Sequence, residues 1–201
     1  MITKSQLAIK LSKLEVFGAS DVSLEQYSTD AEVAAESLWT AYMNKDIEGK
    51  TIADLGAGTG ILGIAALELG AEFVYFVEID EKAIQMLKNN LKEYEKSRYK
   101  IVNNDIDVFN QKVDTVIMNP PFGTKEKYAD RMFLLKAYII AKRIYTFHKT
   151  TTAQFIERFS IANGFRLKQK IDFAFPLKMT QEFHKSRIKR IEASLFLLAS
   201  N

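Results

Sequence analysis

Apolar residues recur along the chain with two different periods, which predict the segments that form helices and strands. Residues 3–17 place four large apolar side chains on one helical face, namely Leu7, Leu11, Leu14 and Phe17. The stretch Thr29-Asp30-Ala31-Glu32 has the composition of a capping box, in which the Thr29 hydroxyl and Glu32 carboxylate satisfy free N–H groups at a helix start. We therefore expect two N-terminal helices, the second ending near Asn44.

From Thr51 onward, short apolar runs alternate with segments of helical period. Helices are expected at residues 61–69, 80–95, 129–142 and 151–163. Strands are expected at 51–55, 72–79, 100–105, 113–119, 144–148, 165–175 and 188–199. Strands that alternate with helices form a parallel sheet covered on both faces. No helix separates the last two strands, so they should pair antiparallel at one edge. The sequence thus predicts one α/β domain, residues 1–201, with a seven-stranded, mostly parallel sheet and an N-terminal helical extension over residues 1–48.

The amino-acid composition excludes several kinds of catalytic and metal-binding site. The chain has no cysteine, which excludes disulfides, thiolate catalysis and cysteine zinc sites, and its two histidines disfavour a histidine metal site. The first 17 residues lack the features of a signal peptide, and no apolar run is long enough to span a membrane, so we expect a cytoplasmic protein. Residues 1–124 carry a net charge of −7 and residues 125–201 a net charge of +10. This asymmetry favours a polyanionic partner for the C-terminal half.

A glycine-rich turn, "ADLGAGTGILG" at residues 53–63, joins the first predicted strand of the alternating region to the helix after it. Gly56, Gly58 and Gly60 allow a tight turn and close approach of a ligand to the backbone. Glu78 ends the next strand, where a carboxylate would bind ribose hydroxyls. From these residues alone, NAD and S-adenosyl-L-methionine (AdoMet) both remain candidate cofactors.

Two further carboxylates favour AdoMet. Asp54 precedes the glycines, where it suits a ligand that carries an ammonium and a sulfonium and would repel a pyrophosphate. Asp105 ends the third strand of the alternating region, where it could accept a hydrogen bond from the adenine amine. With Glu78, these side chains lie at the carboxyl ends of neighbouring strands, the edge at which open α/β sheets bind ligands.

The sequence Asn119-Pro120-Pro121-Phe122 follows a strand expected to lie next to 51–55, and therefore beside the cofactor. An aromatic exocyclic amine is a poor nucleophile because its lone pair is delocalised into the ring. The Asn119 amide oxygen and the Pro120 carbonyl could both accept hydrogen bonds from that amine and free the lone pair for attack. Pro121 would stiffen the loop, and Phe122 offers a flat face for a base flipped out of its stack.

The glycine turn and Asn-Pro-Pro-Phe together resemble the amino-group AdoMet-dependent methyltransferases that carry a [D/N]-P-P-[F/Y/W] sequence. Within them, the chain resembles the methyltransferase-like protein five family and its archaeal counterparts, which methylate adenine at N6 in small-subunit ribosomal RNA. The likeness extends over most of the chain. Its segments are "LEQYST" (24–29), "ADLGAGTGILGIAALELGA" (53–71), "VEIDEKA" (77–83), "DTVIMNPPFGTK" (114–125), "IYTFHKTTT" (144–152) and "EFHKSRIKRIEASL" (182–195).

The resemblance implies a Rossmann-like class I methyltransferase fold with one antiparallel strand, and AdoMet as cofactor. Together with the glycine turn, it gives a predicted cofactor set of Gln26, Tyr27, Thr29, Asp54, Gly56, Gly58, Thr59, Gly60, Ile61, Glu78, Asp105 and Ile106. It implies that Asn119, Pro120 and Phe122 contact the substrate amine. The chain departs from the family at Ser28, where proline is expected, and at Glu78, where aspartate is commoner.

The basic segment at residues 176–190 is the expected RNA-binding loop, because backbone charge dominates affinity for nucleic acid. A solvated hairpin loop is the alternative. The predicted substrate contacts are Lys178, Phe183, His184, Lys185 and Arg187 in this loop, with His148 and Lys149 at the end of strand 144–148. The strand "KIVNN" (100–104) is expected at a sheet edge, and the resemblance implies that a small zinc-bearing activator of the Trm112 type adds a strand there.

Four alternatives remain open from sequence. A protein glutamine-amide methyltransferase also uses an Asn-Pro-Pro loop, although tyrosine typically follows its prolines. A DNA adenine methyltransferase would need a sequence-reading domain, for which 201 residues leave no room. A non-catalytic RNA-binding scaffold would have no need for an amine-binding loop. An NAD oxidoreductase lacks any candidate acid for hydride transfer.

Overall fold

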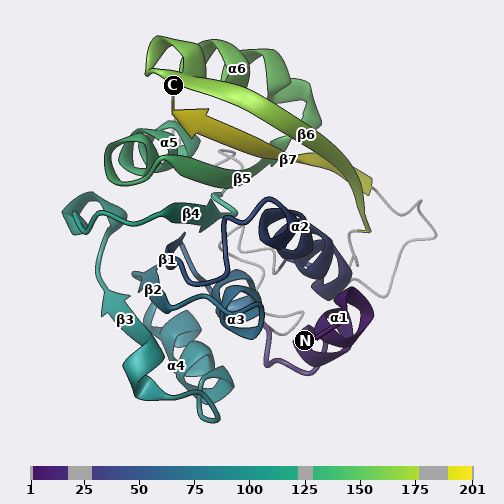
Figure 1. Ribbon diagram of the computed structural model, residues 1–201, viewed down its shortest axis with the longest axis vertical. Helices are drawn as coiled ribbons and strands as arrows, with labels where there is room; N and C mark the ends of the chain where they lie inside the picture. The colour runs from purple at the N-terminus through teal and green to yellow at the C-terminus, as the bar shows by residue number, and fades with distance from the viewer. Residues whose placement is uncertain (1, 18–28, 122–128, 177–189, 201) are drawn as a thin grey trace, which may run out of the picture.

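The computed structural model describes residues 2–17, 29–121, 129–176 and 190–200, which form a sheet between two helical layers (Figure 1). The strands are β1 (Thr51–Leu55), β2 (Phe73–Glu78), β3 (Tyr99–Asn103), β4 (Thr115–Met118), β5 (Arg143–Lys149), β6 (Phe165–Pro176) and β7 (Arg190–Ser200). The helices are α1 (Lys4–Leu11), α2 (Ala31–Met43), α3 (Ile61–Glu68), α4 (Glu81–Asn90), α5 (Ala129–Ile140) and α6 (Ala153–Ala162). Three short 3₁₀ turns are η2 (Lys96–Arg98), η3 (Ile106–Val108) and η4 (Thr150–Thr152).

The sheet confirms the predicted fold class. Its seven strands follow the order β3-β2-β1-β4-β5-β7-β6, and β7 alone runs in the direction opposite to the other six. The last two strands pair antiparallel, as expected, but β7 lies between β5 and β6 and leaves β6 at the edge. At the other edge is β3, as predicted for residues 100–104. Because β1 has β2 on one side and β4 on the other, the glycine turn and Asn119 follow adjacent strands.

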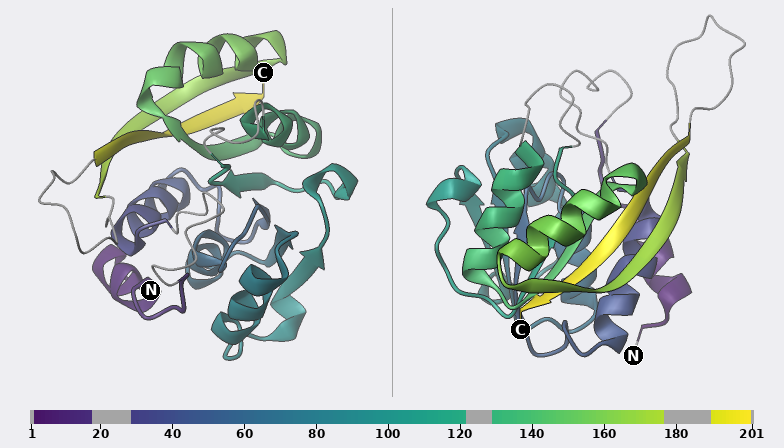
Figure 2. Two further views of the ribbon diagram at one scale, coloured as in Figure 1. Left: turned by 180° about the vertical axis from the view of Figure 1, so that it is seen from behind. Right: turned by 90° about the horizontal axis from the view of Figure 1, so that it is seen from above.

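Two hydrophobic cores cover the two faces of the sheet. One core joins α1, α2, α3 and α4 to the sheet through side chains such as Leu7, Leu38, Phe76 and Leu87. The other joins α5 and α6 to the opposite face through Leu134, Ile156 and Phe196, among others. Figure 2 shows α1 and α2 on the far side of the sheet from α5 and α6. No helix in the described ranges is long and apolar enough to cross a membrane.

Helix α2 begins one residue later than the capping box predicted. Asp30 is the N-cap, and its side chain accepts hydrogen bonds from the backbone N–H groups of Glu32 and Val33. The Thr29 hydroxyl instead accepts a hydrogen bond from the Asn119 side chain, at 3.0 Å. The capping prediction at Thr29 was therefore wrong, because Asp30 caps the helix and the Thr29 hydroxyl has a tertiary partner.

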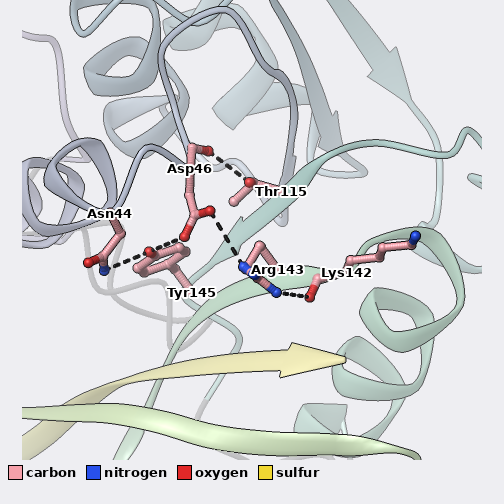
Figure 3. Close-up of polar contacts among 6 residues, drawn as sticks. All are labelled: Asn44, Asp46, Thr115, Lys142, Arg143 and Tyr145. Carbon is pink, nitrogen blue, oxygen red and sulfur yellow. Dashed lines mark hydrogen bonds and ion pairs between the residues drawn. The ribbon is translucent and has the colours of Figure 1, made fainter. Parts of the chain in front are cut away.

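The turn after α2 is fixed to the beginnings of β4 and β5 by a polar cluster (Figure 3). The Tyr145 hydroxyl donates to the Asp46 carboxylate at 2.7 Å and accepts from the Asn44 amide at 3.1 Å. Arg143 forms an ion pair with Asp46 at 3.5 Å, and the Thr115 hydroxyl donates to the Asp46 carbonyl at 2.8 Å. Burial, followed by the hydrogen bond to Asp46, raises the pKa of Tyr145, so the phenol keeps the proton that it donates. This cluster secures α2 against the sheet.

Candidate active site

The glycine turn folds over the carboxyl end of β2. The backbone N–H groups of Gly56 and Ala57 both donate to the Val77 carbonyl, at 2.9 and 3.0 Å. Gly56 has a φ of 68°, and a Cβ there would lie 2.9 Å from the Phe133 ring. Gly60 has a φ of 92°, and a Cβ there would lie 2.3 Å from Leu87. Positive φ and close packing therefore require glycine at these positions.

Glu78 holds the shape of this turn. One carboxylate oxygen accepts from the Gly58 N–H at 2.7 Å, and the other accepts from the N–H groups of Ile79 and Asp80 at 2.8 and 2.9 Å. The residue is only 8% exposed. Because a carboxylate has about four lone-pair sites, one acceptor position remains for a ligand hydroxyl. The glutamate side chain at residue 78, which is longer than the aspartate common in the family, thus links β2 to the glycine turn directly.

Asp54 is buried one residue before the end of β1. Its Oδ2 accepts a hydrogen bond from the Gly63 N–H at 2.8 Å, which connects β1 to the first turn of α3. Burial raises the pKa of Asp54 to about 7, with a further contribution from the Glu78 charge, while the Gly63 hydrogen bond opposes the rise. A cation bound nearby would favour the ionised form of this carboxyl group.

The predicted adenine-binding residues lie on η3, just after β3. Asp105 is the exposed N-cap of this turn and accepts from the Asp107 N–H at 2.8 Å, whereas Ile106 is buried. The turn is held by Lys136 of α5, which is 7% exposed and donates to the Asp107 carbonyl and the Asn110 side chain at 2.9 and 3.0 Å. This contact could not be predicted from sequence, since lysine on a helix is usually solvated.

The Asn119 side chain follows β4 and is oriented by Thr29. Its Nδ2 donates to the Thr29 hydroxyl at 3.0 Å. Its Oδ1 is buried and has no hydrogen-bond partner within the described residues. Pro120 is buried and Pro121 is exposed. A buried acceptor without a partner is costly, so this oxygen is suited to a ligand that brings an N–H donor.

Of the remaining predicted contacts, Thr59 and Ile61 are buried where the glycine turn enters α3. His148 lies in the interior: the residue is 2% exposed, its Nε2 is 2.9 Å from the Thr146 hydroxyl, and burial lowers its pKa to about 3. The side chain is enclosed in this structure, and the contact of His148 with a nucleotide stays a prediction. Lys149 is partly exposed at the end of β5.

The remaining predicted site residues lie outside the described residues. They are Gln26, Tyr27, Phe122, Lys178, Phe183, His184, Lys185 and Arg187.

Metal-binding side chains do not gather in the described part of the chain. No group of three or more histidines and carboxylates within it could hold a metal ion. The arrangement instead brings together backbone N–H groups, buried carboxylates and one free amide oxygen, all near the carboxyl ends of β1, β2, β3 and β4. These groups can bind a ligand that carries hydroxyls, positive charge and an amine.

Asp54→Asn should change how stability depends on pH. The pKa of Asp54 is raised from 3.8 to about 7 on folding, so the wild-type protein loses stability as pH rises through this interval. The Asn variant lacks this titration. Its free energy of unfolding should therefore improve relative to wild type by about 1.4 kcal/mol per pH unit between roughly pH 5 and 6.5. Urea unfolding across this range measures the difference. The exposed Asp107→Asn serves as control, and its free energy of unfolding should change with pH as that of wild type does. If the free energy of unfolding of Asp54→Asn also changed with pH as in wild type, the raised pKa of Asp54 would be contradicted.

Comparison with known proteins places this arrangement in a family. The model of the methyltransferase small domain matches residues 26–141, which contain the glycine turn, Glu78, Asp105 and Asn119. This match covers more than half of the chain and includes α2 through α5.

Relatives and solved structures cover nearly the whole chain. An rRNA N(6)-adenosine-methyltransferase METTL5 from Danio rerio is 34% identical over 88% of this chain and 89% of its own. An uncharacterized protein from Methanocaldococcus jannaschii is 33% identical over 98% of this chain and 94% of its own. The crystal structure of a candidate RNA methyltransferase from Pyrococcus horikoshii has a TM-score of 0.89 and 44% identity, covering 100% of this chain and 98% of that one. The chain belongs to the methyltransferase small domain family and, within it, to the METTL5 group of rRNA N6-adenosine-methyltransferases.

Proposed function

We propose that this protein transfers a methyl group from AdoMet to the exocyclic N6 amine of an adenosine in structured RNA, specifically small-subunit ribosomal RNA. The observation that carries the proposal is the buried Oδ1 of Asn119, which has no partner in the described structure. Asn119 follows β4, the strand next to β1 and the glycine turn. The similarity to rRNA N6-adenosine-methyltransferases over 88% of the chain supports the reaction and the polymer.

The residues of the glycine turn fit AdoMet. Gly58 has open space where a Cβ would stand, Glu78 has one acceptor position free for a ribose hydroxyl, and Asp105 offers an exposed carboxylate to an adenine amine. Asp54 is a buried carboxyl group that a cationic ligand would hold in its ionised form. AdoMet supplies an electrophilic methyl group on a sulfonium, and these residues would bind and orient it.

Asn119 prepares the amine for attack. The N6 group has two N–H donors, and the Asn119 Oδ1 and the Pro120 carbonyl supply two acceptors. Accepting both hydrogen bonds draws the nitrogen lone pair out of conjugation with the ring. This lone pair would form the new N–C bond as the S–C bond breaks, with the electron pair of the broken bond remaining on sulfur as a neutral thioether. The extra proton on the methylated nitrogen would then be released to water. In the structure the Thr29 hydroxyl accepts from the Asn119 Nδ2, and this leaves the Oδ1 end of the amide for the substrate.

RNA would approach from the C-terminal half, which carries a net charge of +10 over residues 125–201. Phosphate contacts position nucleic acid without reading its sequence, so shape and one unpaired adenosine would provide specificity. The strand β3 is paired with β2 alone in the described sheet, which leaves an edge that a protein activator of the Trm112 type could extend by one strand. The predicted location is the cytoplasm, where ribosomal subunits would be available.

The substrate can be identified by label transfer. The protein and methyl-labelled AdoMet are incubated separately with small-subunit ribosomal RNA and with a peptide-release factor, and each product is digested. We expect labelled N6-methyladenosine from the RNA and no label in the factor. Labelled methylglutamine would favour the protein-amide reaction, and tight RNA binding without transfer would favour a scaffold.

Asn119→Ala should separate catalysis from cofactor binding. Loss of a preorganised acceptor at the reacting nitrogen should reduce kcat by about a hundredfold or more. AdoMet affinity, measured by calorimetry, should stay within about threefold, since Asn119 is assigned to the amine and not to the cofactor. A collapse of AdoMet binding would contradict this division of roles.

The variants Thr29→Val and Thr29→Ser provide a matched pair, because only the first removes the hydroxyl that binds the Asn119 amide. We expect a lower kcat in Thr29→Val and recovery in Thr29→Ser.

A further inference from the structure

Asn90, the last residue of α4, makes three side-chain hydrogen bonds to two distant segments. Its Oδ1 accepts from the Glu15 N–H at 2.8 Å, and its Nδ2 donates to the Glu15 carbonyl at 2.9 Å. The same Nδ2 donates to the Thr59 carbonyl at 2.9 Å. One amide group therefore joins the segment after α1, the end of α4 and the glycine turn.

The contact with Thr59 acts directly on the cofactor-binding turn. Thr59 is 4% exposed and immediately precedes Gly60, the N-cap of α3. Gly60 has no side chain with which to cap the helix, so the local conformation depends on backbone contacts. A donor that holds the Thr59 carbonyl limits how this peptide can rotate, and thus where the neighbouring N–H groups point.

The neighbouring Asn89 makes a different contact. Its Nδ2 donates to the Glu15 carboxylate at 2.9 Å, so it holds the same distant residue without touching the glycine turn. The two adjacent asparagines thus separate two effects: both hold the N-terminal extension to α4, but only Asn90 connects that extension to Thr59.

We propose that Asn90 is a positioning residue for AdoMet, and that it couples docking of the N-terminal extension at Glu15 to the shape of the glycine turn. The inference rests on the proposed function, in that AdoMet binds at this turn. Coupling is reciprocal, so bound AdoMet also stabilises the contact at Glu15. Cofactor affinity thereby depends on a segment that is 75 residues from Asn90 in sequence.

The effect of bound AdoMet on the contact between Glu15 and Asn90 can be tested in the wild-type protein. Hydrogen exchange of the Glu15 amide, followed by NMR, reports on its hydrogen bond to Asn90. Adding AdoMet should slow this exchange several-fold. An exchange rate at Glu15 that AdoMet leaves unchanged would overturn the coupling.

The variants Asn90→Ala and Asn90→Asp test the positioning role. Asn90→Ala removes all three hydrogen bonds, and Asn90→Asp keeps the acceptor for Glu15 while losing both donors. We expect each to raise the AdoMet Kd, measured by calorimetry, by about three- to tenfold, the effect of one net hydrogen bond. The KM for AdoMet should rise while kcat at saturating AdoMet changes little.

Asn89→Ala is the matched control, with its AdoMet Kd expected within about twofold of wild type. Equal Kd values for wild type and Asn90→Ala, or an equal rise in Asn89→Ala and Asn90→Ala, would overturn the positioning role and leave only a structural one. Failure of the wild-type protein to bind AdoMet would instead overturn the proposed function itself, and the inference with it.

Discussion

The hydrogen bond between the Asn119 amide and the Thr29 hydroxyl is the contact on which the candidate active site depends. It holds the amide nitrogen and leaves the buried Oδ1 without a partner in the described structure. It also joins the start of α2 to the end of β4. The polar cluster around Asp46 secures the other end of α2 to the sheet, so the helix that follows Thr29 is held at both ends.

The cofactor-binding side of the site depends on the same principle, in which buried polar groups are shared between distant segments. Glu78 binds three backbone N–H groups and joins β2 to the glycine turn. Asn90 adds the N-terminal extension, and Lys136 holds η3 against α5. Each contact replaces water around a buried group, so the elements that carry the site are positioned together. The extension is thus part of the site's support and more than a cover for one face of the core.

Much of this structure could be predicted from sequence because the signals are local. Periodicity gave the helices and strands, and the glycine spacing gave the turn at Gly56 and Gly60. The contacts Asn119–Thr29 and Asn90–Glu15 could not be predicted, since they join residues 90 and 75 positions apart. The capping box failed because the next residue caps the helix and Asn119 binds the Thr29 hydroxyl. The burial of His148 was not foreseen from its position at a strand end, although strand alternation puts it on the same buried face as Thr146.

The proposed mechanism requires the free Oδ1 of Asn119 to receive the adenine amine. A crystal structure of the protein with S-adenosylhomocysteine and adenosine monophosphate would show whether it does. We expect the adenine N6 to lie about 2.7–3.2 Å from the Asn119 Oδ1, while the Nδ2 remains on the Thr29 hydroxyl. The mechanism would be contradicted if the adenine bound elsewhere, or if the Asn119 Oδ1 accepted its hydrogen bond from the protein and left the N6 amine without an acceptor.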